Sequence, residues 1–163
     1  MQFEQELQHQ VWAEKKIITL TRTVSDFNWS KDIPILEKSL KELYVHKLEI
    51  MWFWFSLCKK KSLKTLGEPP NFQSMDKEGL LSTLLKSFNE MINFTLKTDE
   101  KLILDLNWVK KPYEVTTHEI IYSILNHHTY HRGEIAIILK HLGIDVPETN
   151  YNAYMFEINE LYE

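Results

Sequence analysis

The sequence predicts an all-α protein, and two features of the chain lead to this prediction. Only four glycines and five prolines occur in 163 residues, so few positions break a helix. Leu, Ile, Glu, Lys and Met recur at helical spacing, whereas runs of β-branched residues are short. A chain of this length can bury its own core. We therefore expect one helical domain covering residues 1–163.

The composition is that of a folded, water-soluble protein. Hydrophobic residues make up 44% of the chain and charged residues 26%, unlike the composition of a disordered segment. The formal net charge of −4 and the lack of a face rich in Lys and Arg disfavour nucleic acid as a partner. The longest apolar run, residues 50–58, is about half the roughly 20 residues that span a bilayer, so we expect no membrane partner.

Cysteine usage and the N-terminal residues favour the cytoplasm. Cys58 is the only cysteine, which excludes an intrachain disulfide and suits a reducing compartment. Residues 1–14 are polar and acidic, without the basic and apolar pattern of a signal peptide. A cytoplasmic location is therefore expected.

Three long helices are expected before residue 100. One apolar stripe over residues 1–24 predicts the first helix. Residues 25–32 are rich in side chains that compete for backbone hydrogen bonds, so we expect a loop there. The second helix is expected over about residues 32–61, with Pro34 tolerated in its first turn. The third helix is expected over about residues 76–97.

A fourth long helix and a short closing helix are expected in the rest of the chain. Residues 102–115 are interpreted as an irregular connection, although leucines alternate there as in a strand. Thr116 and Glu119 have the spacing of a capping box and predict the start of the fourth helix. Gly143 is a typical residue to end that helix, and residues 151–162 predict the short helix.

Three histidines are expected to face the interior on two of these helices. At about 100° per residue, His127 and His131 lie about 40° apart, on the same side as Ile120, Ile124, Ile138 and Leu142. His46 lies among apolar residues of the second helix by the same count. A buried polar group without a partner costs about 1–3 kcal/mol, and one metal ion would satisfy all three rings. Three imidazole ligands leave open positions for water or substrate.

Each of these signals has an ordinary alternative when taken alone. A single inward histidine more often bonds a backbone carbonyl or a carboxylate, and this would suffice for His46. Two histidines at i and i+4 are a weak signal, because the chain lacks the glutamate of an HExxH motif. The case for a metal therefore depends on the three histidines together.

A longer motif around the second and third histidines resembles a known family. Residues 126–134, Asn-His-His-Thr-Tyr-His-Arg-Gly-Glu, and the Leu-Gly pair at 142–143 resemble the NHxxxHRGQ and LG segments of the DinB/YfiT-like metalloenzyme superfamily. His46 followed by Trp52 is similar to the first ligand helix of that family, and the Trp-Ala pair at 12–13 resembles its first helix. The resemblance covers nearly the whole chain.

The resemblance implies a fold, cofactors and a partner. It implies a four-helix bundle with a long crossover connection, and a divalent metal held by His46, His127 and His131. Zinc and nickel are the leading metals, with iron and manganese as further candidates. The family includes bacillithiol- and mycothiol-dependent transferases and isomerases, so a low-molecular-weight thiol is a second expected cofactor. Homodimers are frequent in the family, and one is expected here.

Two residues depart from the family pattern. Glu134 stands where the family usually has Gln, about 20° from His127 on the helical wheel. Its carboxylate could orient a ligand imidazole, complete the metal sphere or act as a catalytic base. A surface charge paired with Arg132 or a lysine is an equal alternative. Tyr151-Asn152 replaces the usual acidic residue after the last proline turn. Either departure would change the substrate or remove catalysis.

Three functions remain open from the sequence. The leading one is a metal-dependent enzyme acting on a small-molecule substrate, either a thiol S-transferase or a hydrolase-like enzyme, in which the ion lowers the pKa of a bound thiol or water. The second is a non-enzymatic, dimerising stress-response bundle whose metal has Glu134 or Glu49 as a fourth ligand. The third is a helical interaction domain without metal.

Overall fold

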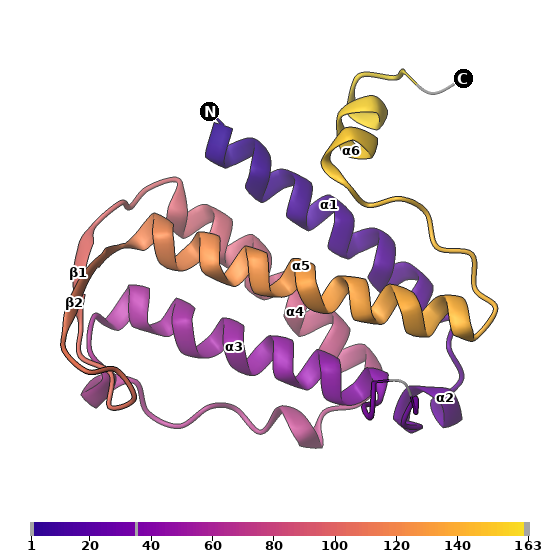
Figure 1. Cartoon of the computed structure of the whole chain (residues 1–163), viewed down its shortest axis with the longest axis horizontal. Helices are drawn as coiled ribbons and strands as arrows, with labels where there is room; N and C mark the ends of the chain where they lie inside the picture. Colours follow the sequence, from indigo (N-terminus) through magenta and orange to yellow (C-terminus); the bar gives the residue numbers. More distant parts are fainter. Residues whose placement is uncertain (1, 35, 162–163) are drawn as a thin grey trace.

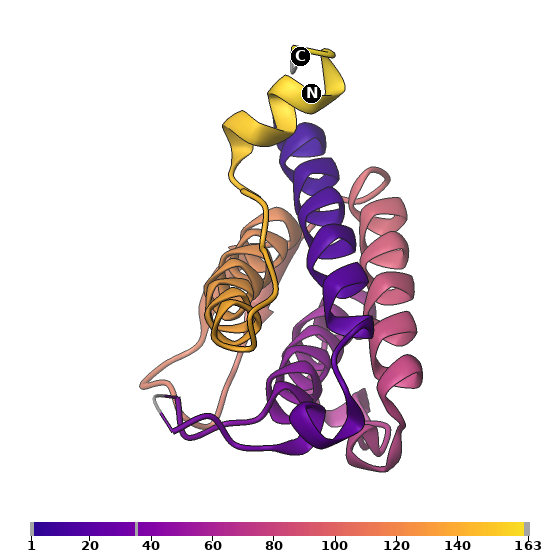
Figure 2. The ribbon, with the colours of Figure 1, turned by 90° about the vertical axis from the view of Figure 1, so that its right-hand side faces the viewer.

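Four long helices form a bundle in the computed structural model, which describes residues 2–34 and 36–161 (Figure 1). They are α1 (Gln2–Arg22), α3 (Leu40–Lys60), α4 (Lys77–Thr95) and α5 (Thr117–His141). α1 and α3 each pack against both α4 and α5, as the second view shows (Figure 2). The short helix α6 (Tyr151–Ile158) lies beside α1. The all-α fold with a short C-terminal helix is confirmed.

The connection between α3 and α4 is the long crossover that the family resemblance implies. Residues 61–76 return along the length of the bundle, so that α3 and α4 run in the same direction (Figure 1). Two short 3-10 helices, η1 (Leu63–Thr65) and η2 (Phe72–Ser74), lie in this connection. η2 packs against α3, and its Phe72 is buried. The crossover is therefore anchored to the bundle.

The hydrophobic core lies between the four long helices. α4 contributes Leu80, Leu84, Phe88 and Met91 from one face, and each of these side chains is 0% exposed. Their spacing is that of an amphipathic helix, and burying a side chain of this size is worth about 1.5–3 kcal/mol.

None of the helices in the described part of the chain combines the length and the apolar character needed to span a membrane.

Reciprocal caps begin the two helices that carry the three histidines. The Ser39 hydroxyl accepts a hydrogen bond from the Glu42 N–H at 3.2 Å, and the Glu42 carboxylate accepts one from the Ser39 N–H at 2.8 Å. Thr116 and Glu119 form the same capping box at the start of α5, as predicted. Gly143 follows the last turn of α5 with a φ of 79°, which confirms the predicted end of that helix.

The expected loop over residues 25–32 is wrong. The one-turn helix α2 (Asp26–Ser30) forms there, because the Ser25 side chain accepts a hydrogen bond from the Asn28 N–H. Trp29 is buried, with its ring centroid 5.5 Å from that of Tyr44. Burial of one large aromatic side chain thus overrides the local preference for a loop.

The expected start of the second helix near Asp32 is also wrong. The chain makes a tight turn instead, in which the Ile33 N–H donates to the Lys38 carbonyl at 3.0 Å. Pro34 lies in this turn, and Glu37 has a φ of 51°, which a right-handed helix cannot accommodate. The Ser39 cap then starts α3 at Leu40, eight residues later than expected.

The expected irregular connection over residues 102–115 contains two strands at its ends. β1 (Lys101–Leu104) pairs antiparallel with β2 (Tyr113–Thr116) and places Lys101 opposite Thr116. Leu102 and Leu104 are buried, whereas Ile103 between them is exposed. The alternating leucines were therefore a strand signal. The hairpin lies at one end of the bundle and leads directly into α5 (Figure 1).

Candidate metal centre

The three histidines singled out from the sequence lie together between α3 and α5. His46 comes from α3, and His127 and His131 come from adjacent turns of α5. The Nε2 atom of His127 lies 3.0 Å from the Nε2 atoms of both His46 and His131. The ring planes of His46 and His131 meet at 84°, those of His127 and His131 at 75° and those of His46 and His127 at 59°, so no two rings stack face to face.

The cluster has a buried side and an open side. His131 is buried, with 3% of the residue exposed, whereas His46 and His127 are half-buried. The inward direction predicted for all three rings is therefore complete only for His131. The other two rings lie at the rim, where a small molecule from solvent could reach them.

The environment of the cluster favours the neutral form of His46 and His127. Burial, followed by the nearby charges of His131 and His46, lowers the pKa of His127 to about 4. Burial also lowers the pKa of His46, and the charges of His131 and Lys38 act in the same direction. Neutral imidazole is the form that offers a lone pair to a metal. At neutral pH, His46 and His127 are therefore in the state that binds a cation.

Hydrogen bonds among the three rings cannot satisfy all three Nε2 atoms at once. The Nδ1 atom of His131 lies 2.5 Å from Oε2 of Glu134 and carries the proton of that bond when the ring is neutral. The Nε2 atom of His131 is then an acceptor. The single proton available at Nε2 of His127 cannot serve both His131 and His46 well. One cation would accept all three lone pairs.

Two of the three separations between the ring nitrogens match those of ligands on a divalent ion. One nitrogen of each ring lies within 4.8 Å of the other two, and both closest separations are 3.0 Å. Metal–nitrogen bonds of about 2.0–2.1 Å place neighbouring ligand atoms roughly 2.9–3.4 Å apart. The described residues therefore contain a three-histidine group that could bind a metal ion.

Glu134 holds His131 by the ring nitrogen opposite Nε2. Burial alone would raise the pKa of the Glu134 carboxyl, but hydrogen bonds from His131 and Tyr130 outweigh it and lower the pKa below its usual value. The ionised carboxylate orients the ring and makes its Nε2 a better ligand. Arg132, an alternative partner, instead donates to Oε1 of Gln10 at 2.6 Å.

A cavity of about 260 Å³ opens beside His46. Its wall combines charged, amide and aliphatic side chains, from Lys38, Glu42, Leu43, Val45, Glu49 and Gln73. His46 is the member of the histidine cluster that lines this cavity. Lys38 and Glu49 give the wall one positively and one negatively charged side chain that could bind a small molecule.

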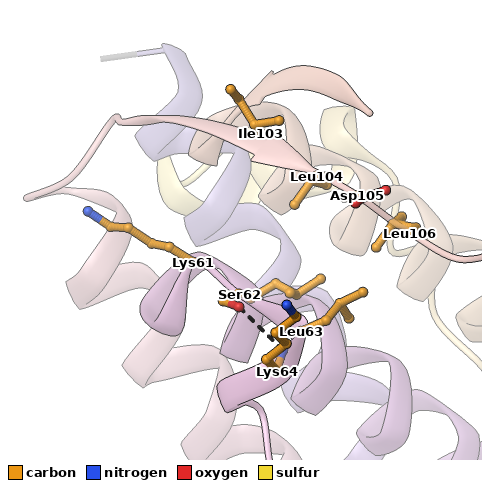
Figure 3. A pocket seen from close by; sticks show the side chains of 9 residues that line it. Lys61, Ser62, Leu63, Lys64, Ile103, Leu104, Asp105 and Leu106 are labelled. Atoms are coloured by element: carbon orange, nitrogen blue, oxygen red, sulfur yellow. Dashed lines mark hydrogen bonds between the residues drawn. The ribbon is translucent and has the colours of Figure 1, made fainter. Parts of the chain in front are cut away.

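A second cavity lies at the far end of α3, away from the histidines. It measures about 140 Å³ and is lined by Leu57, by residues 61–64 and by residues 103–106 (Figure 3). Leu57 is eleven residues after His46, or about 16 Å along the helix axis. This cavity therefore plays no part in the candidate centre.

Sequence reasoning missed a buried ion pair next to the centre. Lys47 donates to both carboxylate oxygens of Glu14, at 2.7 and 2.8 Å, and both side chains are 0% exposed. One feature of the sequence indicated that Glu14 is buried, because Glu14 continues the apolar stripe of the first helix after Leu7 and Val11. Its partner Lys47 directly follows His46 in the sequence.

Two further residues with side chains that can bind a metal lie outside the cluster. His128 is fully buried and packs edge-on against Phe88 with ring centroids 5.1 Å apart. Neither of its ring nitrogens bonds to a described residue. Cys58 is buried, which raises the pKa of its thiol to about 12. The histidine group found among the described residues does not include it.

Comparisons with known proteins agree with this fold. The DinB family model matches residues 1–161. Protein DinB of Bacillus subtilis (strain 168) is 25% identical over 162 residues, which cover 91% of each chain. A crystal structure of a DinB-like protein from Bacillus subtilis shares the fold with a TM-score of 0.67 at 16% identity, covering 90% of this chain and 98% of that one. The chain belongs to the DinB family.

Proposed function

We propose that this chain is a cytoplasmic, metal-dependent enzyme in which His46, His127 and His131 hold one divalent ion. Zinc or nickel is the leading candidate, followed by iron or manganese. The observation that carries the proposal is the convergence of three ring nitrogens, two of them 3.0 Å from the third, at a partly open face of the bundle.

The make-up of the cluster favours an enzyme over a purely structural site. Within the described part of the chain, no carboxylate or thiol joins the three histidines. Three protein ligands are typical of catalytic metal sites, since an exogenous ligand takes the remaining position. The non-enzymatic alternative needs Glu134 or Glu49 as a fourth ligand. Glu134 is instead bonded to Nδ1 of His131, which supports an orienting role for it.

The reaction that we propose is thiol S-transfer, with a hydrolase-like reaction as the other form. A divalent ion in the centre would lower the pKa of a thiol or water and so supply a nucleophile at neutral pH. Glu134 keeps the Nδ1 proton and the ring orientation of His131. Lys38 and Glu49 line the cavity where a small-molecule substrate would lie against His46. Family membership supports the choice of a thiol.

Metal content tests the first part of the proposal. Wild-type protein and the His127→Ala variant would be purified without a histidine tag, incubated with zinc or nickel, desalted and analysed for bound metal. We expect about one ion per wild-type chain and a large loss in the variant, which removes one of three ligands. No bound metal in either protein would instead support a helical interaction domain.

Activity tests the second part. Metal-loaded and metal-free protein would each be mixed with bacillithiol and a model electrophile, and separately with a model ester. We expect the loaded protein to consume one of the electrophiles faster, and His127→Ala incubated with the same metal to match the metal-free protein. Equal rates for loaded and metal-free wild type with bacillithiol would exclude the thiol reaction.

We also propose that residues 1–163 form a single domain that assembles as a homodimer. Large apolar side chains are exposed along α5, at Tyr122, Tyr130 and Ile137, which are 59%, 64% and 50% exposed. A surface of this kind is suited to a partner helix. Light scattering of the eluting protein would measure the mass directly, and a mass near 19.5 kDa would contradict the dimer.

A further inference from the structure

A layer of buried charge lies directly behind the histidine cluster. Lys47 follows His46 in α3, and Arg132 follows His131 in α5. Both cationic side chains point to one carboxylate, Glu14 of α1. Lys47 Nζ lies 2.7 and 2.8 Å from its two oxygens, and a guanidinium nitrogen of Arg132 lies 3.7 Å from Oε1.

This charged layer is costly to bury. The side chains of Glu14 and Lys47 are 0% exposed, and that of Arg132 is 5% exposed. Charges that leave water lose their hydration, and a buried ion pair is often no more stabilising than well-packed apolar side chains of the same size. Stability alone therefore gives little reason for three charged groups at this place in the core.

The placement of the layer gives a better reason. Neighbouring residues share a peptide unit and their Cα atoms are about 3.8 Å apart, so a shift of Lys47 carries His46 with it. The same holds for Arg132 and His131. A metal centre requires ligand distances within roughly 0.2 Å. A contact that fixes α3 and α5 at this level of the bundle therefore acts on the distances between the ring nitrogens.

We infer that Glu14 is a positioning residue of the metal centre. From α1, its carboxylate binds the residue after His46 and faces the residue after His131, and so sets the spacing of the two helices at which the histidines converge. The inference rests on the proposed metal function. It differs from the role of Glu134, which orients the ring of His131 within one helix.

The test uses cobalt(II) as the probe in the full chain. The double variant Glu14→Met, Lys47→Met removes one negative and one positive charge together and keeps the buried volume similar. We expect the affinity for cobalt, measured by competition with a chelator, to fall about 10- to 100-fold, as for other residues that support metal ligands. The visible spectrum of the bound cobalt should change as well, because it reports ligand geometry.

A matched control removes another ion pair of α1. Lys16 Nζ lies 2.6 Å from Oε2 of Glu157 in α6, and the two side chains are 30% and 45% exposed. Neither residue is part of the histidine group. The double variant Lys16→Met, Glu157→Met should keep the wild-type cobalt affinity and spectrum. Circular dichroism of each metal-free protein shows whether it is folded.

A folded Glu14→Met, Lys47→Met protein with wild-type cobalt affinity and spectrum would overturn the inference. If this variant does not fold, Glu14→Asp replaces it, since it keeps the charge but shortens the side chain by one methylene. The same loss of affinity is expected there, and wild-type values would overturn the inference. Wild-type protein that binds no cobalt would refute the proposed function itself, whereas binding that every variant retains would refute only the role of Glu14.

Discussion

Replacing Glu134 by Gln tests how the candidate centre is held together. The carboxylate accepts a hydrogen bond from Nδ1 of His131 at 2.5 Å, and the two side chains are only 13% and 4% exposed. Gln keeps an acceptor oxygen and nearly the same shape but carries no charge. The substitution therefore isolates the effect of the negative charge on the ligand imidazole.

The expected loss follows from the strength of this contact. A hydrogen bond to a charged group contributes about 1.5–3 kcal/mol, compared with about 0.5–1.5 kcal/mol for a neutral pair. Binding of a cation at Nε2 makes the Nδ1 proton more acidic, so the contact with the carboxylate strengthens in the metal-bound state. A difference of about 1.4 kcal/mol corresponds to a tenfold change in affinity. We expect Glu134→Gln to weaken zinc binding about tenfold.

Competition with a chromophoric chelator at fixed pH measures the zinc affinity of each protein. Glu49→Gln is the matched control, because it removes the same charge one turn after His46 from an exposed side chain that makes no contact with His131. Its affinity should stay within about twofold of wild type, as expected for an exposed and solvent-screened charge. Equal losses in the two variants, or wild-type affinity for Glu134→Gln, would refute the orienting role of Glu134.

Three further predictions concern stability. Gly143→Ala should lower the free energy of unfolding by about 1 kcal/mol, because Gly143 has a φ of 79°, whereas Gly133→Ala, in α5 with open space around it, should raise it by roughly 0.5–1 kcal/mol. Chemical denaturation of both variants checks this pair, and the same sign for both would contradict it. Ser39→Ala should cost about 1 kcal/mol in the same assay through loss of the α3 cap, and an unchanged midpoint would count against that cap. Hydrogen bonds from the backbone and hydroxyl of Ser39 lower the pKa of Glu42 below 4.5, so its contribution is present above that value and is lost as the pH falls through the folded-state pKa. The melting temperature of wild type should therefore fall more steeply below about pH 4.5 than that of Glu42→Gln, and parallel curves would contradict this assignment.

Features that depend on nearby residues could be predicted from the sequence. The capping box of Thr116 and Glu119 and the end of α5 at Gly143 were both correct, since each depends on bonds within one helical turn. The orientation of His131 followed from helical periodicity. That His46 meets the other two histidines could not follow from periodicity, because it depends on how α3 packs against α5. The family motif supplied that expectation.

The errors arose where side-chain packing or a tight turn overrides the pattern of the sequence. Trp29 of α2 packs on Tyr44 of α3, and α3 starts late because Glu37 has a positive φ in a turn closed by Ile33 and Lys38. Lys47 and Glu14 form an ion pair across two helices, so neither residue alone predicts the contact.

The separation of the ligands along the chain has a consequence for unfolding. His46 and His127 are 81 residues apart in sequence but meet at 3.0 Å. An ion bound to both would close a loop that contains the crossover, α4 and the hairpin, much as a cross-link does. In the chain-entropy description, a covalent link of this length removes about 4.5 kcal/mol of unfolded-state entropy at room temperature. The metal would then act as a reversible cross-link, and the free energy of unfolding would depend on the concentration of free metal.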